Sequence, residues 1–133
     1  MSDSNSVTGS CLCGRIKLTI DTFDRGVVYC HCTQCRKQSG HYYAATNASN
    51  DKLHIEGAEY ITWYAASDSA KRGFCKHCGS VLLWKPTDGS YTAVMAGCLD
   101  APTELAEVSH IFTADKGDYY TLQDGLPQYE WSD

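Results

Sequence analysis

The sequence lacks the features that mark several classes of protein. It contains no run of Lys or Arg, and its net charge of -5 argues against binding the phosphate backbone of nucleic acid as its main task. No apolar stretch approaches the ~18 residues that a membrane-spanning helix needs. The opening six residues have neither the basic start nor the apolar segment of a secretion signal. These absences predict a cytoplasmic protein with no nucleic-acid partner and no membrane association.

Linkers, low-complexity tracts and internal repeats are also absent, apart from recurring pairs of cysteines. A chain of 133 residues is long enough to bury a core and is most simply one domain. We therefore expect a flexible N-terminal tail over residues 1–6 and a single domain over residues 7–133.

Short segments of alternating or β-branched residues recur between turn signals, which predicts a mainly β protein built of antiparallel sheets. A helix of little more than one turn is expected over Thr33 to Gln38, closed by Gly40, because this polar segment lacks alternation and ends at a glycine. A turn is expected over Asn47 to Asp51. The expected strands are 15–20, 27–30, 42–46, 60–64, 81–84, 91–95 and 108–113.

Cysteine, in contrast, is abundant: seven of the eight fall into three tight clusters. Thiolates suit Zn²⁺, and short gaps let neighbouring sulfurs reach one ion about 2.3 Å away. A framework of disulfides is the alternative, but in a reducing compartment clustered cysteines more often hold metal. The clusters are Cys11 with Cys13, Cys30 with Cys32 and Cys35, and Cys75 with Cys78.

Two of the clusters each have the form of half a zinc site. Cys11 and Cys13 would project from the same face of a strand, and Cys75 and Cys78, followed by Gly79, have the spacing of a zinc knuckle. Joining the halves gives a closed, four-thiolate structural site that would pin the start of the domain to its middle. Buried thiols with no metal are the alternative for either pair taken alone.

The third cluster supplies three sulfurs, from Cys30, Cys32 and Cys35, and a zinc with three protein ligands keeps a position for water or substrate. The sequence therefore predicts an open second site there. Two alternatives stay open: Cys98 could complete a closed four-cysteine site, or the three thiols could be redox-active without metal.

Charged and histidine neighbours of the clusters are weaker candidates. His31 and His77 lie inside the ligand loops, but the cysteines already fill the coordination expected of zinc, so positions beside the ligands or facing solvent are favoured. Arg36 follows the open cluster and is a candidate for binding a substrate carboxylate, the alternative being a solvated basic edge of the helix. No Asp or Glu stands beside the trio, so no catalytic residue is assigned beyond the second zinc site.

Three motifs in this order resemble those of the glutathione-dependent formaldehyde-activating enzyme (GFA, or CENP-V/GFA domain) family. Similar pieces follow at residues 97–100, 110–112 and 124–127, and Cys98 stands where the family usually has a small residue other than cysteine. The three motifs are Gly-Ser-Cys-Leu-Cys-Gly at 9–14, Cys-His-Cys-Thr-Gln-Cys-Arg-Lys-Gln-Ser-Gly at 30–40, and Phe-Cys-Lys-His-Cys-Gly-Ser at 74–80.

The resemblance implies a β-tent fold of coiled antiparallel β-sheets with zinc-binding loops, and two zinc ions. One is a structural zinc on Cys11, Cys13, Cys75 and Cys78; the second, open zinc lies on the 30–35 trio. It also implies an activity, in which a thiol such as glutathione adds to an aldehyde such as formaldehyde, or the reverse carbon-sulfur cleavage takes place.

The leading hypothesis is therefore a zinc-dependent carbon-sulfur lyase or adduct-forming enzyme. Three thiolates weaken the Lewis acidity of zinc, so the open position is better suited to delivering a thiolate than to making hydroxide. The main alternative is a non-catalytic, zinc-stabilised β-tent binding module. A third, weaker idea is a thiol reductase with Cys98 as its nucleophile.

Overall fold

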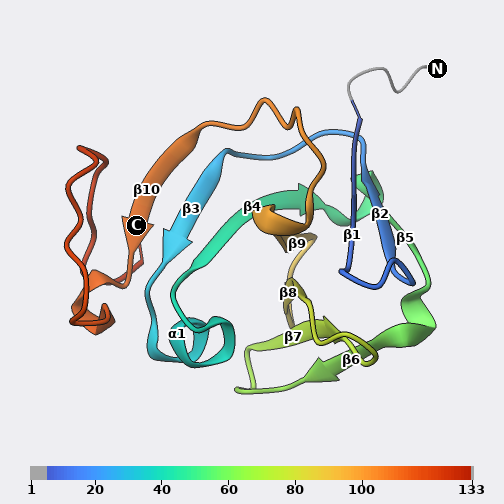
Figure 1. Ribbon diagram of the computed structural model, residues 1–133, viewed down its shortest axis with the longest axis horizontal. Coiled ribbons are helices and arrows are strands. Elements are labelled where there is room, and N and C mark those ends of the chain that lie inside the picture. Colours follow the sequence, from blue (N-terminus) through green and yellow to red (C-terminus); the bar gives the residue numbers. More distant parts are fainter. Residues whose placement is uncertain (1–5, 133) are drawn as a thin grey trace.

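The computed structural model describes residues 6–132 and confirms a mainly β protein (Figure 1). All of the predicted tail except Ser6 lies outside the described residues. Between the strands stand one α-helix, α1 (Thr33–Ser39), and short 3₁₀ turns that include Ala96–Cys98. The strands are β1 (Val7–Ser10), β2 (Lys17–Ile20), β3 (Val27–Cys30), β4 (Tyr43–Ser49), β5 (Leu53–Glu56), β6 (Ile61–Tyr64), β7 (Ala70–Cys75), β8 (Val81–Pro86), β9 (Tyr91–Met95) and β10 (Glu107–Ile111).

The strands form two sheets. The smaller has the order β1-β2-β5 and the larger the order β10-β3-β4-β9-β8-β7-β6. Neighbouring strands pair antiparallel, as predicted, with one exception: β10 lies parallel to β3 at the edge of the large sheet. Figure 1 shows the large sheet curving from β10 and β3 round to β6 and β7, with the small sheet standing at the far side from β10.

The main core fills the space between the small sheet and the curved large sheet. Alternation in β2 explains the contribution of the small sheet, because Leu18 and Ile20 are buried, while Lys17 is exposed and Thr19 is half-buried. From the large sheet come Leu83 and Val94, which are fully buried. Burial of such side chains contributes about 1.5–3 kcal/mol each, so this cluster stabilises the contact between the sheets.

A second, smaller core lies beneath α1. It contains Cys35 from the helix, Tyr43 and Ala45 from β4, and Ala93 and Met95 from β9. The helix ends where it was predicted to end, since Gly40 adopts a left-handed φ of 88° and its amide donates to the Arg36 carbonyl. The helix is thereby docked on β4 and β9 with its cysteine inward.

Seven of the ten strands found within residues 6–132 were predicted, and alternation alone does not separate them from the others, because β5 alternates apolar and polar residues yet was not predicted. The strands over 27–30 and 91–95 have the predicted bounds, whereas β1, β5 and β7 were not predicted. The turn expected from Asn47 to Asp51 was wrong in its first half, because β4 continues to Ser49 to pair with β9 and buries Ala48. Within residues 6–132, no helix is long and apolar enough to cross a membrane.

Candidate functional site

Four cysteines from two distant segments meet between the sheets. The sulfurs of Cys11, Cys13, Cys75 and Cys78 all lie within 4.8 Å of one another. The Sγ atoms of Cys11 and Cys13 are 3.6 Å apart, and those of Cys13 and Cys75 are 3.7 Å apart. A tetrahedron with metal-sulfur arms of 2.3 Å has edges of about 3.8 Å. The spacing of these sulfurs therefore fits a single tetrahedral metal ion.

Tight turns point these sulfurs inward. Gly14 and Gly79 both adopt left-handed φ angles, of 82° and 78°, and each closes a turn back to the first cysteine of its pair. The two turns are joined by a hydrogen bond of 2.9 Å from the Leu12 amide to the Ser80 hydroxyl. Backbone amides also donate to the sulfurs, as Ile16 does to Cys11 at 3.4 Å. Such hydrogen bonds favour the thiolate form that a metal requires.

Three further cysteines meet at the end of β3 and the start of α1. The sulfurs of Cys30, Cys32 and Cys35 lie within 4.8 Å of one another, and Sγ of Cys30 and Sγ of Cys35 are 3.4 Å apart. Among residues 6–132, no other His, Cys, Asp or Glu joins this group. The trio therefore fits a metal ion that keeps one position for an added ligand.

Cys32 has a double role, because it is also the N-cap of α1. Its sulfur accepts a hydrogen bond of 3.2 Å from the Cys35 amide, as a Ser or Asp oxygen would. Hydrogen bonds from Cys30 and Cys35 lower the pKa of Cys32 to about 2, whereas the hydrogen bonds of Cys30 with Cys32 and Cys35 raise the pKa of Cys30. The negative charge of the trio is thus concentrated on the capping sulfur.

A buried arginine on β7 reaches this cluster. Arg72 is 4% exposed, and its Nη1 atom lies 3.7 Å from Sγ of Cys35. Gln34 and Gln38 of α1 accept further hydrogen bonds from the guanidinium, at 2.9 and 3.3 Å. The guanidinium stacks over the ring of Tyr43, 5.2 Å from its centroid. Sequence reasoning missed this residue, since β7 was not predicted and no spacing rule links position 72 to the trio.

A cavity of about 630 Å³ opens beside the three-cysteine cluster. All three cysteines and Arg72 line it. Its other walls are divided evenly between aromatic or apolar residues, such as Trp84 and Phe112, and polar residues, which include Arg25 and Asp115. The buried Oδ1 of Asn47, also in the lining, has no hydrogen-bond partner among the described residues. A volume in the range of small-molecule sites, with apolar walls and several polar groups, is typical of a ligand-binding pocket.

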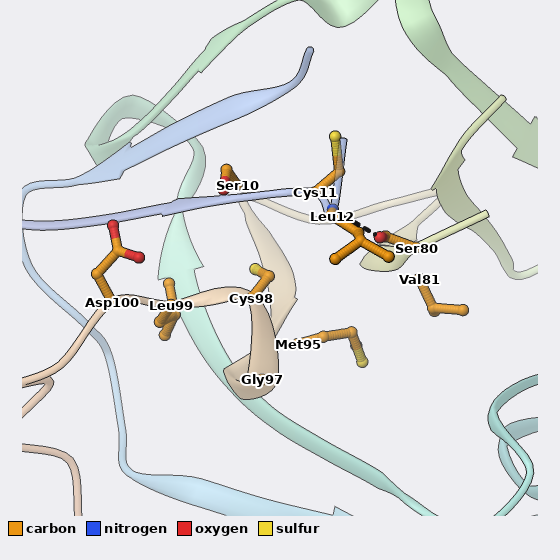
Figure 2. A pocket seen from close by; sticks show the side chains of 10 residues that line it. All are labelled: Ser10, Cys11, Leu12, Ser80, Val81, Met95, Gly97, Cys98, Leu99 and Asp100. Carbon is orange, nitrogen blue, oxygen red and sulfur yellow. Dashed lines mark hydrogen bonds between the residues drawn. The ribbon is translucent and has the colours of Figure 1, made fainter. Parts of the chain in front are cut away.

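Cys98 lies beside the other cluster. It packs on the main core and lines a separate cavity of about 520 Å³, together with Cys11 and Leu12. Figure 2 shows Cys98 beside Leu99, on the segment that runs below Ser10 and Cys11 in this view. The alternative in which Cys98 completes the three-cysteine site is therefore wrong. Burial raises the pKa of Cys98 to about 12, which keeps its thiol protonated and unsuited to act as a nucleophile.

The other candidates take different places. Arg36 does not line the cavity, and its Nε donates to the Asp115 carbonyl at 3.3 Å. A role for Arg36 in substrate binding stays a prediction, and Arg72 is the guanidinium that lies at the sulfurs. His77 is exposed beside the ring of Tyr60.

His31, fully buried, points away from the trio into a polar chain that the sequence did not reveal. Its Nδ1 lies 2.5 Å from the Tyr120 hydroxyl, and its Nε2 lies 2.9 Å from Nδ1 of His110. Nε2 of His110 lies 2.7 Å from the Asp124 carboxylate. Because the carboxylate only accepts, one set of donors satisfies the chain: Tyr120 to His31, His31 to His110, and His110 to Asp124. Burial lowers the pKa of His31 to about 4, so its ring is neutral.

Comparisons with known proteins agree with this architecture. The family model described as "Glutathione-dependent formaldehyde-activating enzyme" matches residues 6–115. A curated protein of Schizosaccharomyces pombe, named as an uncharacterized lyase, is 33% identical over 81 residues, which are 61% of this chain and 58% of the relative. The match thus spans less than two thirds of that relative. A crystal structure of a Rhodobacter sphaeroides protein shares the fold with a TM-score of 0.61 at 21% identity, covering 92% of this chain and 98% of the other.

Proposed function

The chain belongs to the glutathione-dependent formaldehyde-activating enzyme family, and on that premise we propose that it is a zinc-dependent enzyme that joins a thiol to an aldehyde or cleaves the carbon-sulfur bond of such an adduct. The observation that carries the proposal is the pairing of an incomplete cysteine cluster with a cavity. Three sulfurs within 4.8 Å of one another line a hollow of about 630 Å³, so a ligand in the cavity has direct access to them.

The proposal gives the two cysteine clusters different tasks. Cys11, Cys13, Cys75 and Cys78 would hold a structural zinc with no position left for substrate. Cys30, Cys32 and Cys35 would hold the second, exchangeable zinc. When bound there, zinc supplies a positive centre that stabilises a thiolate or polarises an aldehyde oxygen.

The residues of the cavity would orient the two reactants. The side-chain oxygen of Asn47 is a buried acceptor with no partner among residues 6–132, and an N–H or O–H group of the substrate would satisfy it. Trp84 and Tyr91 would give the carbon atoms of the substrate apolar contacts. In this arrangement a thiol and an aldehyde are held next to each other, which lowers the entropic part of the barrier.

The proposed reaction balances without an oxidant or reductant. The thiol loses its proton, its sulfur bonds to the aldehyde carbon, and the carbonyl electron pair moves to oxygen, which takes up a proton from solvent. The reverse direction breaks the same carbon-sulfur bond. Solvent can exchange both protons, and Asp115 is the carboxylate among the residues that line the cavity.

The test is to mix the zinc-loaded protein with glutathione and formaldehyde and to follow adduct formation by NMR against the uncatalysed rate. A panel of other thiols and of larger aldehydes belongs in the same experiment, because the cavity exceeds the size of a one-carbon aldehyde. We expect acceleration that disappears in Cys32→Ser and persists in Cys98→Ala. A panel with no accelerated pair would contradict the proposed activity and favour a binding module.

A further inference from the structure

Arg72 is a buried cation with no carboxylate partner. The ion pairs found within residues 6–132 are His54 with Asp21 and His110 with Asp124, and neither involves it. The groups that Arg72 touches on α1 and β4, namely Gln34, Gln38 and Tyr43, are ordinarily neutral. A buried arginine keeps its charge and is costly unless an anion compensates it. Within residues 6–132, the group that its guanidinium contacts and that can carry negative charge is the sulfur of Cys35. Arg25 and Asp115 are the other charged residues that line the same cavity.

The contact with sulfur is specific in its geometry. Nη1 donates to Sγ of Cys35, and the two glutamine oxygens fix the plane of the guanidinium against the same helix that carries this cysteine. Arg72 also lines the cavity that a ligand of the trio would enter. Its charge therefore acts both on the cysteine sulfurs and on whatever binds beside them.

We propose that Arg72 makes the three-cysteine site selective for anionic ligands, so that an incoming thiol is held there as its thiolate. This inference rests on the proposed function, since it assigns the charge of the ligand that the same site takes. Three thiolates around a divalent ion leave a net charge of -1, and an anionic fourth ligand brings it to -2. The guanidinium offsets one of these charges and, as a hydrogen-bond donor to the Cys35 sulfur, stabilises it as a thiolate.

The test uses the protein with Co²⁺ in both sites, whose visible spectrum reports ligand exchange without any turnover. Dissociation constants are measured near neutral pH for 2-mercaptoethanol, which binds as a thiolate, and for imidazole, which binds as a neutral ligand. In Arg72→Gln we expect thiolate binding to weaken by about tenfold, the scale set by loss of one opposite charge nearby. Imidazole binding should change by less than about twofold, because a neutral ligand gains little from the cation.

Two further variants keep the test decisive. Gln34→Glu places a carboxylate where an amide oxygen now lies 2.9 Å from Nη2, so it neutralises Arg72 without removing it and should weaken thiolate binding in the same direction. Gln34 is exposed in the first turn of α1, where an acidic residue does not disturb the helix. Lys71→Gln is the matched control: it removes one positive charge from the neighbouring, exposed residue of β7 and should leave both constants unchanged.

Equal weakening of thiolate and imidazole binding in both variants, or no weakening in either, would overturn the proposal, as would failure of the wild-type site to bind thiol. Selective weakening of thiolate binding supports it even when no thiol-aldehyde pair is accelerated, a result that would contradict only the proposed activity. If the wild-type protein accelerates the reaction but thiolate affinity is unchanged in Arg72→Gln and Gln34→Glu, the proposed activity is supported and the role of Arg72 is overturned.

Discussion

The two cysteine clusters differ in how far apart in the sequence their members lie. Cys13 and Cys75, in contact in the four-cysteine cluster, are separated by 62 positions, and Cys11 and Cys75 are part of the main core. The trio comes from one stretch, Cys30 to Cys35, beside the smaller core and the larger cavity. A metal ion in the first cluster would crosslink distant segments, whereas one in the second would close only a short loop. The first is therefore suited to stabilising the fold, and the second can exchange a ligand without unfolding it.

The largest effect is expected when the four-cysteine cluster is broken. We expect Cys75→Ser to be unfolded at ambient temperature and to show no cooperative melting transition. Structural zinc sites contribute about 10–16 kcal/mol in small domains, as much as the typical stability of a whole domain. Thermal denaturation followed by circular dichroism measures this. Cys98→Ala is the control, since Cys98 lies nearby but outside the cluster. A Cys75→Ser protein that still melts cooperatively near the wild-type temperature would remove the structural role.

Breaking the trio should have a much smaller effect on the fold. In Cys32→Ser we expect the metal content to fall from two ions to one per chain, with loss of thiol binding and a wild-type fold. The serine oxygen can still cap α1, so the helix is retained. Metal analysis and circular dichroism on the same sample check both parts. If Cys32→Ser instead loses both ions and unfolds, the assignment of a structural role to the four-cysteine cluster and a ligand-exchanging role to the trio is wrong.

The grouping of the sulfurs matches the predicted one. Short-range geometry brings together residues i and i+2 of a strand and the two cysteines of the Cys75–Cys78 turn, and the need for four ligands predicted that the two distant pairs meet. Their role as metal ligands stays a prediction. The surroundings could not be predicted, because Arg72 reaches Cys35 from a strand 37 positions away. A buried charge next to Gly73 also breaks the apolar alternation by which β7 would have been recognised.

The hydrogen-bonded chain of His31, His110 and Asp124 lies next to the trio, because His31 stands between Cys30 and Cys32. The stability that this chain contributes should depend on pH. The hydrogen bond from His110 lowers the pKa of Asp124 below its unfolded value of about 3.9. A depressed carboxyl pKa stabilises the fold above the unfolded pKa, and that stabilisation is lost as the pH falls through the folded pKa. Asp124→Asn should therefore melt at a lower temperature than wild type at neutral pH.

The pH dependence of this difference is the sharper measurement. Protonation of thiolates affects both proteins alike and cancels when their melting temperatures are subtracted at each pH. We expect the difference to be constant from neutral pH down to about 4 and to shrink below that, as Asp124 becomes protonated in the wild type. Asp100→Asn, at an exposed carboxylate bonded to the Thr8 hydroxyl, serves as the control. A difference that does not change between neutral and acid pH would show that Asp124 acts through shape alone.

The smallest expected effect compares the glycines that close the two clusters. Gly79 follows the four-cysteine turn at a φ of 78° and Gly40 ends α1 at a φ of 88°, and a Cβ at either would have no atom within 4 Å. Alanine at each position should cost about 1 kcal/mol, from backbone strain alone. The consequences should differ, because Gly79→Ala strains a turn that carries two of the four sulfurs and Gly40→Ala strains the far end of the helix from Cys32. We therefore expect a chelator to remove the structural ion faster from Gly79→Ala than from Gly40→Ala at equal loss of stability. Equal rates would mean that the turn at Gly79 adapts without moving its sulfurs.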